Sequence, residues 1–192
     1  IKYESRVKSF VKGTFDEKRI LKDSAKIHFK TSNNFPLKGL LFGVKDIINV
    51  DGYPTRCGSL LPHELFKGFQ ASCVSKLLNA GAVFAGKTVT AEFAVSDPGE
   101  TRNPRNLSHT PGGSSSGSGA SVAAGFCDIA IGTQTSGSVI RPAGYCGVIG
   151  YKPSFGRISR DGVLLFSNSM VSTGLDCSLS PKIEEFALPY VP

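Results

Sequence analysis

The sequence predicts an α/β fold in which helices flank a mixed, mainly parallel sheet. Short apolar segments that are typical of buried strands alternate with segments of helical periodicity. The composition is that of an ordinary globular protein, with 40% hydrophobic and 19% charged residues. The 192 residues are enough for one domain with a sizeable core. We therefore expect a single domain over residues 1–192.

Residues 1–34 are expected to form a helical segment that ends in the loop Thr31–Asn34. Nine of the 22 Lys and Arg residues lie in the first 30 positions, against four acids, with apolar residues between them at roughly helical spacing. This pattern favours the solvated face of one or two amphipathic helices. A nucleic-acid groove would also need aromatic or polar base readers near the charge, so we expect no nucleic-acid partner.

After residue 34, expected strands and expected helices alternate along the chain. Apolar runs bounded by glycine or turn residues indicate strands, and the 3.6-residue recurrence of apolar or small residues indicates helices. The expected strands are 37–44, 81–86, 128–131 and 148–152, and the expected helices are 70–80, 117–124 and 139–145. Residues 171–192 read as a divergent tail.

The five cysteines are odd in number and contain no C-x-x-C pair, so no metal site is expected. Cys73, Cys127 and Cys146 lie among apolar or small residues and are predicted to be reduced core thiols. Reduced thiols favour an intracellular, cytoplasmic setting. The apolar runs are far shorter than a membrane span requires, so no membrane partner is expected.

The segment Gly81-Ala-Val-Phe-Ala-Gly86-Lys87-Thr88 matches the phosphate-binding P-loop pattern. A P-loop wraps phosphate with the backbone N–H groups between its glycines. Here those positions hold Ala-Val-Phe-Ala, which favours a buried strand whose N–H groups pair with neighbouring strands. We therefore expect no nucleotide cofactor.

A second pattern, Gly113-Ser-Ser115-Ser-Gly117, matches the G-x-S-x-G nucleophile elbow. That elbow must follow a strand directly, whereas a loop with two prolines precedes it here. The three histidines all lie upstream of this serine, which argues against a Ser-His-Asp triad.

Lys45 and Ser138 are the best candidates in this sequence for a catalytic base and a nucleophile. Lys45 ends an apolar run, and a lysine held in a dry pocket at a strand end has a lowered pKa and can act as a neutral base. Ser138 lies at the tip of a turn that follows a strand. The backbone N–H groups of Thr135, Ser136, Gly137 and Ser138 could converge there as an oxyanion hole. A surface lysine at a strand end remains the alternative for Lys45.

Five segments resemble the amidase signature family in their order and spacing. They are GVKDI, AGAVFAGKT, PGGSSSGS, IGTQTSGSVIRPA and YCGVIGYKPS, and the resemblance covers about Leu37 to Met170. It implies a Ser–cis-Ser–Lys triad, with Ser138 as nucleophile, Ser114 as the bridging serine with a cis peptide, and Lys45 as base.

The resemblance implies hydrolysis of an amide bond in a small molecule through an acyl-enzyme, without a cofactor. Arg141, Gln134 and Ser115 are expected to bind substrate. In malonamidase-like members the arginine binds a substrate carboxylate, although Arg141 could equally pin the loop. Gln134 and the GGSSSGS form resemble the small-molecule amidases more than the A subunits of amidotransferases.

Two departures from the family leave alternatives open. Val171 stands where the family has an acidic residue, and family members are typically more than twice as long as this chain. They motivate the alternative of a catalytically inactive fragment. A separate alternative is a glutamine-hydrolysing A subunit of an aminoacyl-tRNA amidotransferase. A homo-oligomer is also possible, and a lone fragment would leave a sheet edge uncovered.

Overall fold

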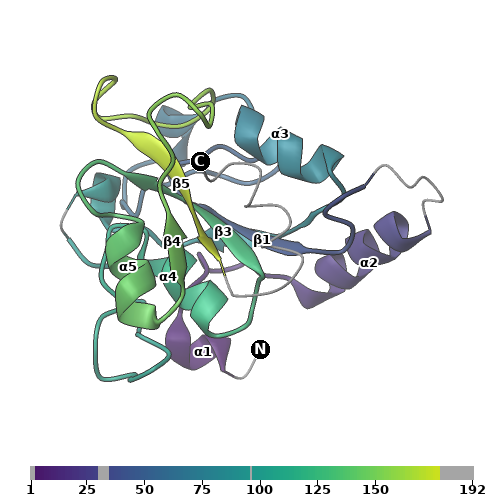
Figure 1. Ribbon diagram of the computed structural model, residues 1–192, viewed down its shortest axis with the longest axis horizontal. Helices are drawn as coiled ribbons and strands as arrows, with labels where there is room; N and C mark the ends of the chain where they lie inside the picture. The colour runs from purple at the N-terminus through teal and green to yellow at the C-terminus, as the bar shows by residue number, and fades with distance from the viewer. Residues whose placement is uncertain (1–2, 30–34, 96, 178–192) are drawn as a thin grey trace.

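The computed structural model describes residues 3–29, 35–95 and 97–177, and its ribbon is drawn in Figure 1. The predicted loop Thr31–Asn34 and residues 178–192 of the predicted tail lie outside these ranges. Within them the chain forms the predicted α/β architecture, with a mixed sheet between helices.

In the described part of the chain, five strands form one sheet in the order β2-β1-β3-β5-β4. β1 pairs in parallel with β2 and with β3, whereas β5 runs antiparallel between β3 and β4. The strands are β1 (Leu41–Lys45), β2 (Val83–Thr88), β3 (Ile129–Gln134), β4 (Ile149–Tyr151) and β5 (Ser172–Cys177). Because β1 and β3 are parallel neighbours, their carboxyl ends lie side by side at one end of the sheet.

Helices cover both faces of this sheet (Figure 1). The α-helices are α1 (Glu4–Val7), α2 (Glu17–His28), α3 (Ser72–Asn79), α4 (Ser116–Ala123) and α5 (Ile140–Cys146), and two short 3-10 helices are η1 (His63–Phe66) and η2 (Glu92–Ala94). α3 packs on one face, and α4 with α2 packs on the other.

The alternation of side chains along the strands builds these two layers. Phe42 and Val44 of β1 pack with Val74 and Leu77 of α3 in one core cluster. α4 needs small residues because other backbone comes very close to it. A Cβ on Gly117 would lie only 2.2 Å from the carbonyl oxygen of Ser9.

Three expectations about the elements need correction. The N-terminal segment is helical only at α1 and α2, because Lys8 ends α1 in the left-handed region, and Phe10 then forms a β-bridge with Thr88. The first strand starts at Leu41 rather than at residue 37, since residues 36–39 form a turn. The predicted tail contributes β5, which pairs with β3 and β4.

The expected core thiols are confirmed. Cys73, Cys127 and Cys146 are buried and unbridged, as is Cys57. No helix of the described residues has both the length and the apolar character needed to cross a membrane.

Candidate active site

Lys45 ends β1 and is completely buried. Its Nζ donates hydrogen bonds to Ser114 Oγ at 2.8 Å and to Thr133 Oγ1 at 2.9 Å. Burial disfavours the ammonium form and lowers the pKa of Lys45 to about 7, although the nearby Asp176 carboxyl acts in the opposite direction. An amine with this pKa is about half neutral at pH 7, and its neutral fraction grows as the pH rises further.

Ser114 lies in the loop before α4 and is also buried. The Gly113–Ser114 peptide bond is cis, as the family resemblance implies. The Ser114 carbonyl oxygen accepts a hydrogen bond from the Ala91 N–H at 3.0 Å, which ties this loop to the segment after β2. The loop thereby holds Ser114 Oγ against the end of β1.

Ser138 lies half-buried in the turn between β3 and α5. Its carbonyl oxygen accepts a hydrogen bond from the Ser115 N–H at 3.1 Å, so the two serine-rich turns lie side by side. Within the described residues the Ser138 hydroxyl makes no hydrogen bond with Ser114 Oγ. The structure therefore joins Lys45 to Ser114 directly and brings Ser138 to the neighbouring backbone.

The turn that carries Ser138 is held by Gln134. The Gln134 side chain accepts hydrogen bonds from the N–H groups of Val139 at 2.9 Å and Ile140 at 3.0 Å. The N–H groups of residues 135–138 donate to no acceptor in the described ranges.

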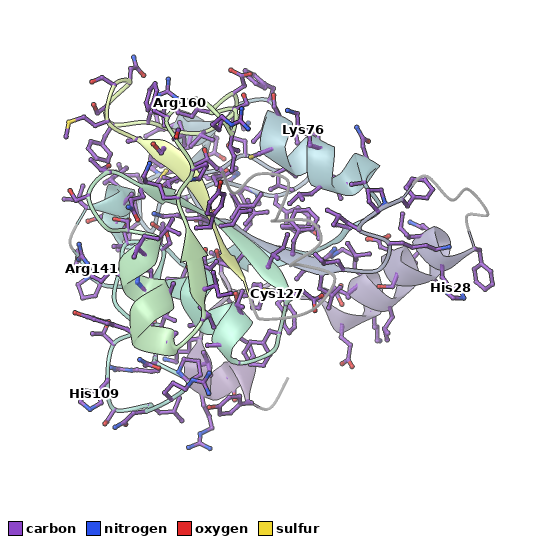
Figure 2. The ribbon with its side chains drawn as sticks, viewed as in Figure 1. His28, Lys76, His109, Cys127, Arg141 and Arg160 are labelled. Carbon is purple, nitrogen blue, oxygen red and sulfur yellow. The ribbon has the colours of Figure 1, made fainter. Side chains whose placement is uncertain are left out.

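Arg141 borders a pocket of about 230 Å³ beside the serine loop. Gly112, Gly113 and Ser116 line the same pocket. The Arg141 side chain is exposed and projects outward from α5 (Figure 2), and the ion pairs of the described residues do not include it. Its guanidinium is thus available to a ligand in this pocket.

Ser115 and Gln134 face inward instead. Ser115 is fully buried, and its hydroxyl lies between the Thr133 carbonyl oxygen at 3.3 Å and the Thr133 N–H at 3.4 Å. The lining of the Arg141 pocket includes neither residue. In this structure both side chains hold the turns that carry the serines.

The segment that matches the P-loop pattern is the buried strand β2, as expected. Its lysine, Lys87, is fully buried and forms an ion pair with Asp46 at 2.9 Å, and its Nζ also donates to Thr55 Oγ1 at 3.0 Å. Burial lowers the pKa of Lys87 and raises that of Asp46, while their mutual attraction opposes both shifts. This arrangement places the lysine in an ion pair beside the sheet.

The sequence motifs did not point to two residues near Lys45. Thr133 follows the apolar part of β3, and its place at a strand end was a signal that could have found it. Asp176 lies on β5, in a segment whose sequence did not predict a strand. Among the described residues, no group of three His, Cys, Asp or Glu side chains is placed to hold a metal ion.

Comparison with known proteins adds a second line of observation. The chain matches the Amidase family over residues 1–187. It is 45% identical to the A subunit of glutamyl-tRNA(Gln) amidotransferase from Salinibacter ruber, over 72% of this chain and 28% of that protein. It is 38% identical to the protein of the same name from Sulfurisphaera tokodaii, over 98% and 40% of the two chains.

Solved structures of two related proteins are also similar to this chain. The native peptide amidase from Stenotrophomonas maltophilia has a TM-score of 0.80 and 36% identity, over 90% of this chain and 37% of that one. The A subunit of glutamyl-tRNA(Gln) amidotransferase from Thermotoga maritima has a TM-score of 0.77 and 34% identity, over 91% and 37%. The chain spans less than half the length of these relatives.

Proposed function

This chain belongs to the amidase signature family, and we propose that it hydrolyses an amide carbon–nitrogen bond in a small molecule. The observation that supports this most strongly is the 2.8 Å hydrogen bond between the buried amine of Lys45 and the hydroxyl of Ser114. A buried neutral amine against a serine hydroxyl is the arrangement that a lysine base requires.

The proposed mechanism starts with a proton relay. Neutral Lys45 takes the proton of Ser114, and Ser114 takes the proton of Ser138. Ser138 Oγ then bonds to the amide carbon, and the electron pair of the carbonyl bond moves to its oxygen. The link between Ser114 and Ser138 closes when substrate is bound, since catalytic hydrogen bonds commonly tighten only in the complex.

The oxyanion is stabilised by the N–H groups of Thr135, Ser136, Gly137 and Ser138. Collapse of the tetrahedral intermediate breaks the carbon–nitrogen bond, and the relay returns its proton to the leaving nitrogen. Water, activated by the same relay, hydrolyses the acyl-enzyme to the acid and free Ser138. Removal of one oxyanion donor would cost about 3 kcal/mol of transition-state stabilisation.

The exposed guanidinium of Arg141 supports a compact substrate with an acidic group in the adjoining pocket. A planar guanidinium binds a carboxylate through two parallel hydrogen bonds. In this proposal Gln134 and Ser115 contribute by holding the turns around the pocket.

A fluorophosphonate probe tests the nucleophile. The probe should label the parent chain. It should also label the control variant Ser108→Ala, in which an exposed serine outside the site is replaced. Ser138→Ala should remain unlabelled. Equal labelling of Ser138→Ala and the parent would reject Ser138 as nucleophile, and an unlabelled parent would favour the inactive-fragment alternative.

A second candidate is a glutamine-hydrolysing protein that supplies ammonia to a partner. Two relatives of this chain carry the name of the A subunit of glutamyl-tRNA(Gln) amidotransferase, which supports it. Co-expression with the other subunits of such an enzyme distinguishes the two. Glutaminase activity that appears only with those subunits would favour this candidate, and turnover of small amides by the chain alone would favour the first.

A further inference from the structure

Asp176 places a carboxyl group on the face of the sheet toward α5. Side chains two residues apart along a strand share a face, so Asp176 lies on the face of Gly174. A Cβ on Gly174 would lie 3.2 Å from the Val139 side chain, at the start of α5. Asp176 pairs with Ala130 of β3 and with Gly150 of β4.

Lys45 faces the same layer. By the same alternation it shares a face with Gly43, where a Cβ would meet the Ala130 Cβ and the Cys127 Sγ, each at 3.5 Å. Gly43 pairs with Ala130, and Ala130 pairs with Asp176. The amine and the carboxyl group thus belong to one buried layer, on strands separated only by β3.

The Asp176 carboxyl group is fully buried, and within the described residues neither of its oxygens has a hydrogen-bond partner. Burial raises the pKa of Asp176 well above its usual range, and the charge of Lys45 opposes that rise. A buried carboxylate without partners is costly, so ionisation of Asp176 depends on a nearby positive charge.

Other titratable groups around Asp176 do not supply that charge. The thiols of Cys127 and Cys146 face it from the start of β3 and from α5, and burial raises the pKa of each to about 12, so both are neutral. α4 contributes serine, glycine, alanine and valine, and Arg141 of α5 is exposed. Among the described residues, Lys45 is the cation whose charge acts on Asp176.

We propose that Asp176 is a positioning residue that acts through Lys45. Its carboxylate form stabilises the ammonium form of Lys45, so this buried acid sets the lowest pH at which the amine is free to accept the Ser114 proton. The catalytic meaning of this inference rests on the proposed function, whereas the coupling between the two groups does not.

The sign of the effect follows from the charges. An ionised Asp176 favours protonated Lys45 and raises its pKa, and the two groups titrate as a coupled pair. Replacement of Asp176 by a neutral residue leaves burial to act on Lys45 alone. The pKa of Lys45 then falls.

The test compares Asp176→Asn and Asp176→Leu with the parent, and Asp23→Asn on the surface of α2 is the matched control. NMR of protein labelled at lysine Cε follows the titration of Lys45, with its signal assigned by loss in Lys45→Met. Both Asp176 variants should lower the pKa of Lys45 by about half a unit or more, and the control should not. The pH profile of fluorophosphonate labelling should shift to lower pH by the same amount.

An unchanged Lys45 titration in both variants would overturn the inference, whatever the labelling shows. A shifted titration in a chain that the probe never labels would keep the coupling and reject the proposed function. Should neither variant fold, the reciprocal measurement decides. The pKa of Asp176, followed by carboxyl carbon NMR, should rise in Lys45→Met, and no rise would overturn the inference.

Discussion

Two buried lysines on neighbouring strands have different partners in this protein. Lys45 ends β1 and Lys87 lies on β2, where it pairs with Val44, and both side chains are fully buried. Lys87 binds the Asp46 carboxylate at 2.9 Å. Lys45 binds the hydroxyl groups of Ser114 and Thr133.

Burial alone therefore does not make a lysine a base. Burial disfavours the charged form of both residues, but a carboxylate in direct contact keeps Lys87 in an ion pair. The hydroxyl groups that contact Lys45 stabilise its positive charge only weakly. We therefore expect Lys87 to stabilise the fold and Lys45 to serve chemistry at the expense of stability.

The largest expected effect is on the labelling rate, and it distinguishes Lys45 from Lys87. Lys45→Met removes the proposed base and should reduce the rate of fluorophosphonate labelling by about 10²–10⁴-fold. The free energy of unfolding should change little, because two effects oppose each other. A lysine whose pKa is lowered on folding destabilises the protein at neutral pH, whereas the variant also loses the hydrogen bonds to Ser114 and Thr133 and the attraction to Asp176. Urea unfolding at pH 7 measures the second quantity. A strongly destabilised but fully labelled variant would contradict the comparison.

The next effect concerns stability. Lys87→Met leaves Asp46 buried without its cation and should lower the free energy of unfolding by about 3–5 kcal/mol. The double variant Lys87→Met with Asp46→Asn removes both charges and should lose clearly less. Circular dichroism during urea unfolding measures both variants. If the single and double variants lost the same stability, the ion pair would not be the reason.

The smallest expected effect is a pH dependence of the labelling rate. Lys45 must be neutral to accept a proton, and its pKa is about 7. The labelling rate should therefore rise about tenfold per pH unit below pH 7 and level off above it. A stopped-flow series with a fluorogenic phosphonate measures this profile. A rise centred near pH 10, where an exposed lysine titrates, would show that Lys45 is not desolvated in solution.

Local patterns predicted most of the elements. The apolar run at Gly81–Gly86 and the small residues at Gly117–Ala124 were close to β2 and α4, because strand and helix periodicities are properties of neighbouring residues. β5 was missed because Ser172–Cys177 has no such pattern. Its strand conformation depends on pairing with β3 and β4, which lie far away in the sequence.

The candidate site was likewise predicted only in part. The motifs predicted which residues to examine, and the structure confirms the cis peptide at Ser114 and the contact between Ser114 and Lys45. They did not predict that Gln134 would hold the turn of α5 through the N–H groups of Val139 and Ile140. A side chain's partners depend on how its turn folds, and the letters of a motif do not contain that information.

Local patterns and motif spacing were enough to predict the family, the order of the main elements and the residues of the proposed relay. The partners of the two buried lysines, a carboxylate for Lys87 and hydroxyl groups for Lys45, became known from the folded chain. The same holds for the buried layer that Asp176 shares with Lys45. Charge states in a protein interior depend on desolvation and on partners from distant segments, and both exist only once the chain has folded.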